Sequence, residues 1–188
     1  SVNGLFVVET GADVTFAGLT LTNGRRGIVN NGGTVTVNHS TIANNATGSG
    51  DSGAGISSVN GVLIVRDSTL RNNTTYFAGG GIYVDGGSAT IINSTFSGNY
   101  SDNTLGGSLA LANGATVTVV NSTIVGSAFQ EVVVNNSTLN LNNSIIVSSG
   151  TPQCQNNSGT VTARHSLIKD GSCGITNGVD GNLTGDPS

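Results

Sequence analysis

The chain has 188 residues, enough for one domain but too few for two of typical size. It contains 29 Gly and 24 Asn but only 16 charged residues, 6 basic and 10 acidic, and its formal net charge is −4. This composition excludes a coiled coil or helical bundle, and six scattered cations cannot supply a nucleic-acid-binding face. Because 36% of the residues are hydrophobic, the chain can bury a core, and its Gly and Asn are typical of β-strands joined by tight turns.

A repeat of 21 to 28 residues fills the chain in seven copies. Each copy contains a short triplet, and the triplets are Leu19-Thr20-Leu21, Ser40-Thr41-Ile42, Ser68-Thr69-Leu70, Ser94-Thr95-Phe96, Ser122-Thr123-Ile124, Ser144-Ile145-Ile146 and Ser166-Leu167-Ile168. An alternating segment precedes each triplet: Val14-Thr15-Phe16, Val35-Thr36-Val37, Leu63-Ile64-Val65, Ala89-Thr90-Ile91, Val117-Thr118-Val119, Leu139-Asn140-Leu141 and Val161-Thr162-Ala163. A period of two residues predicts strands.

The longer copies add a third, glycine-led segment: Gly27-Ile28-Val29, Gly55-Ile56-Ser57, Gly81-Ile82-Tyr83 and Gly107-Ser108-Leu109. Three short strands cannot bury an apolar face alone, but stacked units spaced about 4.8 Å apart enclose a continuous interior. The fold class is therefore predicted as all-β, a parallel β-helix of about seven coils over residues 1–188. Its right hand is expected by analogy with parallel crossovers.

The extra residues of the long copies fall between the triplet and the glycine-led strand, at 46–53, 74–79 and 100–106. One-sided insertions in a repeat protein often mark its binding face. Asn45, Asn73 and Asn99 each follow their triplet Ser by five residues, where we expect a turn or a stacked amide ladder.

Two motifs resemble a known family. Phe96-Ser97-Gly98-Asn99 has the form FxxN and Gly79-Gly80-Gly81-Ile82 the form GGxI, as in the polymorphic outer membrane protein repeats of bacterial surface proteins, which share the pectate-lyase-like superfold. Residues 181–187 are similar to the end of the β-helix in secreted bacterial proteins of the choice-of-anchor type. The resemblance implies export to the cell surface, an adhesin role in some members, and no catalytic residues. Copies five to seven lack both motifs, and Gln130-Glu131-Val132-Val133-Val134 stands in place of the glycines.

We therefore expect a non-catalytic secreted or cell-surface module, a rigid stalk or adhesin, cut from a longer protein. Tyr76, Phe77 and Tyr100 lie in the insertions and are candidates for stacking on the sugar rings of a glycan or host-surface ligand; the alternative is that they cover apolar strand edges.

A polysaccharide lyase or hydrolase is the first alternative. Aligning the residues before the triplets places His39 beside Asp67, with Arg66 adjacent, which could form a base with a charge-stabilising partner. An ordinary ion pair in a polar turn column explains the same residues. No cofactor is expected; Asp51, Asp85 and Asp102 would form a calcium site only if folding brought them together.

An ice-binding surface is the second alternative. Outward pairs of Thr or Ser recur on one face, at Thr34/Thr36, Ser88/Thr90, Thr116/Thr118 and Thr160/Thr162. Asp13, Val62, Ile64 and Asn140 interrupt the array, and Thr is also the common residue of an exposed strand.

The terminal segments and the two cysteines give information on the cellular location of the protein. The first residues lack a signal-peptide pattern, and no apolar run is long enough to span a membrane. Cys154 and Cys173 suit a disulfide, which would point to an oxidising, extracellular compartment; two separate buried thiols are the alternative. Neither end has an amphipathic capping helix, so open strand edges are expected, with end-to-end self-association as a consequence.

Overall fold

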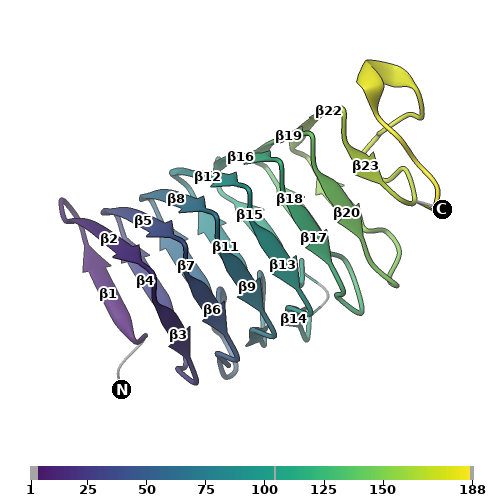
Figure 1. The fold of residues 1–188 in the computed structure, drawn as a ribbon. Coiled ribbons are helices and arrows are strands. Elements are labelled where there is room, and N and C mark those ends of the chain that lie inside the picture. Colours follow the sequence, from purple (N-terminus) through teal and green to yellow (C-terminus); the bar gives the residue numbers. More distant parts are fainter. Residues whose placement is uncertain (1–3, 104, 187–188) are drawn as a thin grey trace.

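The structure, a computed structural model, describes residues 4–103 and 105–186. It is an all-β parallel solenoid in which three seven-stranded sheets run along the molecule (Figure 1). The first sheet contains β1 (Phe6–Glu9), β4 (Ile28–Asn31), β7 (Ile56–Val59), β11 (Ile82–Asp85), β15 (Leu109–Ala112), β18 (Val132–Asn135) and β21 (Cys154–Asn157). The second contains β2 (Asp13–Ala17), β5 (Thr34–Asn38), β8 (Val62–Arg66), β12 (Ser88–Ile92), β16 (Thr116–Val120), β19 (Thr138–Asn142) and β22 (Thr160–Arg164). The third contains β3 (Thr20–Thr22), β6 (Thr41–Ala43), β9 (Thr69–Arg71), β13 (Thr95–Ser97), β17 (Thr123–Val125), β20 (Ile145–Val147) and β23 (Leu167–Ile168).

Each copy of the repeat contributes one strand to each sheet, so neighbouring strands in a sheet are one coil apart. Seven strands per sheet correspond to about six full turns between β1 and β21, close to the seven coils expected. A two-stranded sheet, β10 (Thr74–Thr75) with β14 (Tyr100–Ser101), lies outside the three, and one 3-10 turn, η1 (Val179–Gly181), follows them.

The predicted inward columns are confirmed by the strand register. Leu21, Ile42, Leu70, Phe96, Ile124, Ile146 and Ile168 pair in succession across the third sheet, and all are buried. Phe16, Val37, Val65, Ile91, Val119, Leu141 and Ala163 do the same in the second sheet. The interior is thus a stack of like side chains, each packed on its counterpart one coil away.

The glycine-led strand of the fourth copy begins one residue later than its alignment as Gly107-Ser108-Leu109 predicts. Leu109, not Ser108, pairs with Ile82. The backbone N–H groups of Ser108 and Leu109 both donate to the Glu131 carbonyl, at 3.0 and 2.9 Å. This local bulge absorbs the extra residue and keeps the apolar side chain inside.

The triplet serines form a second kind of ladder. Ser40, Ser68, Ser94, Ser122, Ser144 and Ser166 are all buried. The Ser68 N–H donates to Oγ of Ser94 in the next coil at 3.3 Å, and the Ser68 hydroxyl donates to the Arg66 carbonyl of its own coil. The other serines repeat this pattern, so each hydroxyl ties one coil to the next.

The C-terminal end of the stack is covered, contrary to the expectation of open edges at both ends. In Figure 1 the last segment folds back beyond β22 and β23. Asn182 is buried and replaces the next serine of the ladder, since its Oδ1 accepts the Ser166 N–H at 3.0 Å. Leu183 then bridges Leu167 in parallel. The stretch that resembles the end of known β-helices therefore covers the last coil, although its Pro187 lies outside the described residues.

The predicted disulfide is present. Cys154 of β21 is bonded to Cys173 of the C-terminal segment, with their Cα atoms 5.5 Å apart. The Cys154 N–H also donates to Oγ of Ser172 at 2.9 Å. The bond therefore fixes the covering segment to the first sheet. Among the described residues no helix is long and apolar enough to cross a membrane.

Candidate functional site

The described residues of the insertions, at 46–53, 74–79, 100–103 and 105–106, lie on one edge of the solenoid and continue its stacking. Ala46 bridges Thr74, β10 pairs with β14, and Ala78 bridges Leu105, all in parallel. Between the first two insertions, Oγ1 of Thr47 and Oγ1 of Thr75 lie 2.9 Å apart. These three insertions, with the shorter connections at 23–27 and 126–130, are called the loop edge below.

A buried amide ladder supports the loop edge, as the spacing of Asn45, Asn73 and Asn99 predicted. Nδ2 of Asn45 donates to Oδ1 of Asn73, and Nδ2 of Asn73 donates to Oδ1 of Asn99, each at 3.0 Å. Nδ2 of Asn45, Asn73 and Asn99 also donates to a carbonyl of the preceding coil, that of Leu21, Ile42 and Leu70 respectively. These hydrogen bonds compensate for the free-energy cost of removing the amides from water.

The ladder explains why glycine, at the x position of GGxI, directly precedes the strands β4, β7 and β11. A Cβ atom on Gly55 would lie 2.3 Å from the Gly81 carbonyl oxygen and 3.3 Å from Nδ2 of Asn73. Only glycine leaves room for the amide and for the close approach of the neighbouring coil.

In the fifth copy, which lacks the FxxN and GGxI motifs, a buried carboxyl group occupies the position of the leading glycine. Glu131 is fully buried and stands in the column that continues from Gly27, Gly55, Gly81 and Ser108. Its two oxygens accept from the Ser108 hydroxyl and the Ser127 N–H, each at 2.6 Å. Burial raises the pKa of Glu131 to about 7, although these two hydrogen bonds act in the opposite direction. The sequence marked this position only as a departure from the glycine pattern.

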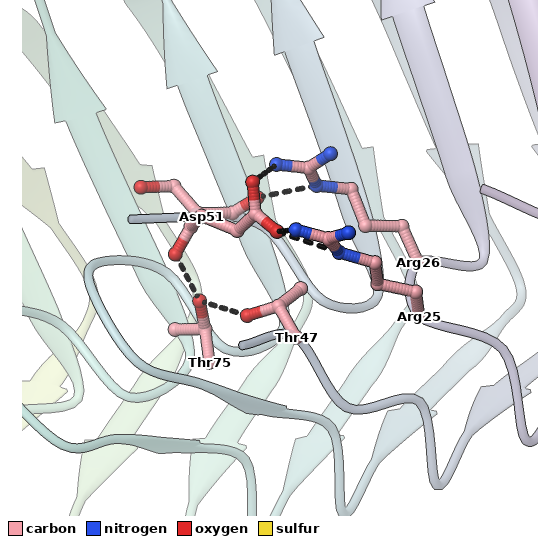
Figure 2. Close-up of polar contacts among 6 residues, drawn as sticks. Arg25, Arg26, Thr47, Asp51 and Thr75 are labelled. Atoms are coloured by element: carbon pink, nitrogen blue, oxygen red, sulfur yellow. Dashed lines mark hydrogen bonds and ion pairs between the residues drawn. The ribbon is translucent and has the colours of Figure 1, made fainter. Parts of the chain in front are cut away.

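A charged cluster joins the first three coils at the loop edge (Figure 2). Asp51 receives Nε and Nη2 of Arg25 on one oxygen and Nη2 of Arg26, at 2.7 Å, on the other. The Asp51 carbonyl accepts from the Thr75 hydroxyl at 2.7 Å and from the Phe77 N–H at 3.2 Å. The Arg26 side chain is 12% exposed and the Arg25 side chain 40% exposed, so Arg26 is the buried member of the pair and Arg25 the accessible one.

The predicted aromatic residues divide into two groups. Tyr76 and Phe77 are 43% and 44% exposed. Tyr100 is half-buried, and its ring packs against Phe129, with centroids 5.9 Å apart. Phe129 is itself 39% exposed and was not among the predicted residues. Its position after the fifth triplet, where the other copies carry their insertions, is the signal that could have found it.

The enzyme candidates lie at a different corner, between the second and third sheets. Nε2 of His39 is 4.0 Å from Oδ2 of Asp67, and these side chains are 70% and 38% exposed. Both residues have positive φ, in a turn column with Asn93, whose Nδ2 donates to Asp67 at 3.2 Å. Arg66 is exposed at the end of β8. The geometry is that of a solvent-exposed contact between polar side chains on a turn, for which the net interaction energy is small.

The acidic residues considered for calcium are held in separate places. Asp51 is engaged by the two arginines, whereas Asp85 ends β11 and accepts from Nδ2 of Asn113 at 2.5 Å. Asp102 is exposed after β14. Within the described part of the chain, no group of three or more His, Cys, Asp or Glu side chains could hold a metal ion.

The outward threonines form columns in register. In the second sheet Thr36 pairs with Ile64, and Asn140 lies between Thr118 and Thr162, so the array is interrupted where the sequence predicted. The third sheet carries an unbroken column of Thr20, Thr41, Thr69, Thr95 and Thr123. Ice binding stays a prediction that depends on these columns.

Comparison with known proteins gives no relative: no protein-family model, curated protein or solved structure matches the chain. The site must therefore be interpreted from its own geometry.

Proposed function

We propose that the protein is a non-catalytic module of a secreted or cell-surface protein, in which the rigid solenoid displays the loop edge for binding glycans. The observation that carries this proposal is the row of aromatic side chains, Tyr76, Phe77, Tyr100 and Phe129, on the loops of three successive coils. Exposed aromatic rings that gather on one surface are typical of binding sites, and their flat faces suit stacking on sugars.

The supporting structure fits this role. The loops are stacked at strand spacing and fixed at their base by buried amides, so the rings are held in place before a ligand arrives. Such preorganisation lowers the entropy cost of binding. The disulfide between Cys154 and Cys173 supports an oxidising, extracellular location.

A glycan array followed by titration of the best ligands tests the proposal. We expect binding by the wild-type domain and at least a tenfold loss of affinity in the double variant Tyr76→Ala/Phe77→Ala. A matched control is Val62→Ala, which removes an equally exposed apolar side chain from the second sheet and should leave affinity unchanged. Equal affinity of the double variant and the wild type would contradict the assignment of the site.

A further inference from the structure

The loop edge also carries a cationic group beside its aromatic rings. Two guanidinium groups face one carboxylate in the Arg25–Arg26–Asp51 cluster, which leaves a formal charge of +1 in a chain whose net charge is −4. Nε of Arg26 donates to the Ser52 carbonyl at 3.0 Å, and the Arg26 side chain is largely buried. Arg26 therefore stabilises the insertion at 46–53. The exposed charge is that of Arg25.

Asp51 contacts both Arg25 and the insertion at 74–79, which carries Phe77. Its carboxylate accepts from Nε and Nη2 of Arg25 (Figure 2). Its carbonyl accepts from the Phe77 N–H. Arg25 belongs to the first coil and Phe77 to the third, a separation of two coils or about 10 Å along the stack. That distance is comparable with the span of two linked sugar rings.

We propose that the glycan bound at the loop edge is acidic, and that Arg25 recognises its carboxylate or sulfate while a ring of the same chain stacks on Phe77. This inference rests on the proposed glycan-binding function. A guanidinium group presents a planar fork of five donors, and Asp51 uses two of those of Arg25, which also fixes the orientation of the fork. Charge-assisted hydrogen bonds from such a fork to an oxyanion are strong and directional.

The test compares acidic glycans with neutral polymers of the same backbone, for the wild type and Arg25→Gln. Polygalacturonate represents the carboxylate source and carrageenan, a sulfated galactan without uronic acid, the sulfate source. Fully methyl-esterified polygalacturonate and desulfated carrageenan are their neutral counterparts. We expect the wild type to prefer at least one acidic polymer over its counterpart, and Arg25→Gln to lose that preference with about a tenfold drop in affinity. Which polymer shows the effect identifies the anionic group.

Two further variants separate charge from folding. Arg25→Lys keeps the charge but loses the fork, so it should recover part of the acidic affinity that Arg25→Gln loses. Arg164→Gln removes an exposed arginine from β22 and should change nothing. Far-ultraviolet circular dichroism checks that each variant is folded.

The outcomes distinguish this inference from the function on which it rests. Equal binding of acidic and neutral polymers, sensitive to Tyr76→Ala/Phe77→Ala but not to Arg25→Gln, would overturn the role of Arg25 and leave glycan binding standing. Binding of no glycan by the wild type would overturn both.

Discussion

Single polar residues inside this solenoid differ in what their burial requires. The Asn side chains of the ladder, in three successive coils, and the Ser side chains, in six, are neutral. The Asn amides and the Ser N–H groups donate to a neighbouring coil, and each Ser hydroxyl donates to a carbonyl of its own coil. Glu131 has no such repeat, and its carboxyl group must either lose water as an anion or keep its proton. Glu131 is therefore a buried group whose protonation changes near neutral pH.

The pH dependence of stability follows from Glu131. Its pKa is about 7 in the folded protein, compared with 4.5 for an unperturbed glutamate, so the folded state holds the proton more tightly. The free energy of unfolding should then fall as pH rises from about 4.5 to about 7 and level off above, by roughly 3 kcal/mol for this group alone. Glu131→Gln should remove this dependence, because an amide does not titrate.

Urea denaturation of both proteins between pH 4.5 and 8 measures the effect. The relevant quantity is the difference between variant and wild type, since the exposed carboxylates are common to both. Gln153 occupies the corresponding place one coil later, so glutamine is compatible with this column. Parallel stability curves for the two proteins would show that Glu131 titrates alike in the folded and unfolded states.

At the scale of the elements, the strands were more predictable than the loops. Apolar alternation specified the second and third sheets to the residue, because a slip by one position would turn every inward side chain outward. The fourth glycine-led strand was displaced by one residue, because a bulge depends on the hydrogen bonds of the next coil and not on local pattern. Strands β1, β18 and β21 lack the leading glycine, so the sequence did not single them out.

The same contrast applies to the candidate site. Tyr76 and Phe77 were predicted because both are aromatic and lie in an insertion. The pairing of Arg25 and Arg26 with Asp51 spans 25 or 26 residues and depends on how the insertion at 46–53 folds back over the first coil. No periodic signal in the sequence reports such a contact.

The amide ladder should contribute strongly to the junction between coils two and four. Asn73→Ala removes the Oδ1 acceptor shared by the N–H and Nδ2 of Asn45, of which Nδ2 keeps only the Leu21 carbonyl. It also removes the Nδ2 donor to the Ile42 carbonyl, and all of these groups are buried. A buried unsatisfied polar group costs about 1 to 3 kcal/mol, so we expect a loss of roughly 3 kcal/mol or more in the free energy of unfolding.

Chemical denaturation of Asn73→Ala beside a control measures this contribution. The control is Asn38→Ala on the outer face of β5, in the column where the first coil already carries Ala17. It should change stability by less than about 0.5 kcal/mol. Similar small losses for both variants would show that the ladder is not a major source of stability.

For the whole molecule, the solenoid behaves as a one-dimensional stack, in which each coil contacts mainly its neighbours. Stability is then local, and an end coil depends on whatever covers it. Here the C-terminal segment covers the last coil through Asn182 and Leu183 and is fixed by the disulfide. At the other end of the described stack, Leu5, Phe6 and Leu19 of the first coil are exposed.

Cleavage of the disulfide should therefore loosen one end of the molecule and not the whole. Closing a loop of 19 residues contributes about 3 kcal/mol in the chain-entropy model, and the constraint acts on the segment that covers β21 to β23. Hydrogen exchange with and without reductant, or with Cys173→Ser, should show loss of protection over residues 154–186 and unchanged protection in the coils before β15. The early coils keep their neighbours on both sides after reduction, so nothing in their packing changes. A uniform loss of protection along the chain would instead mean that the stack unfolds as a single cooperative unit.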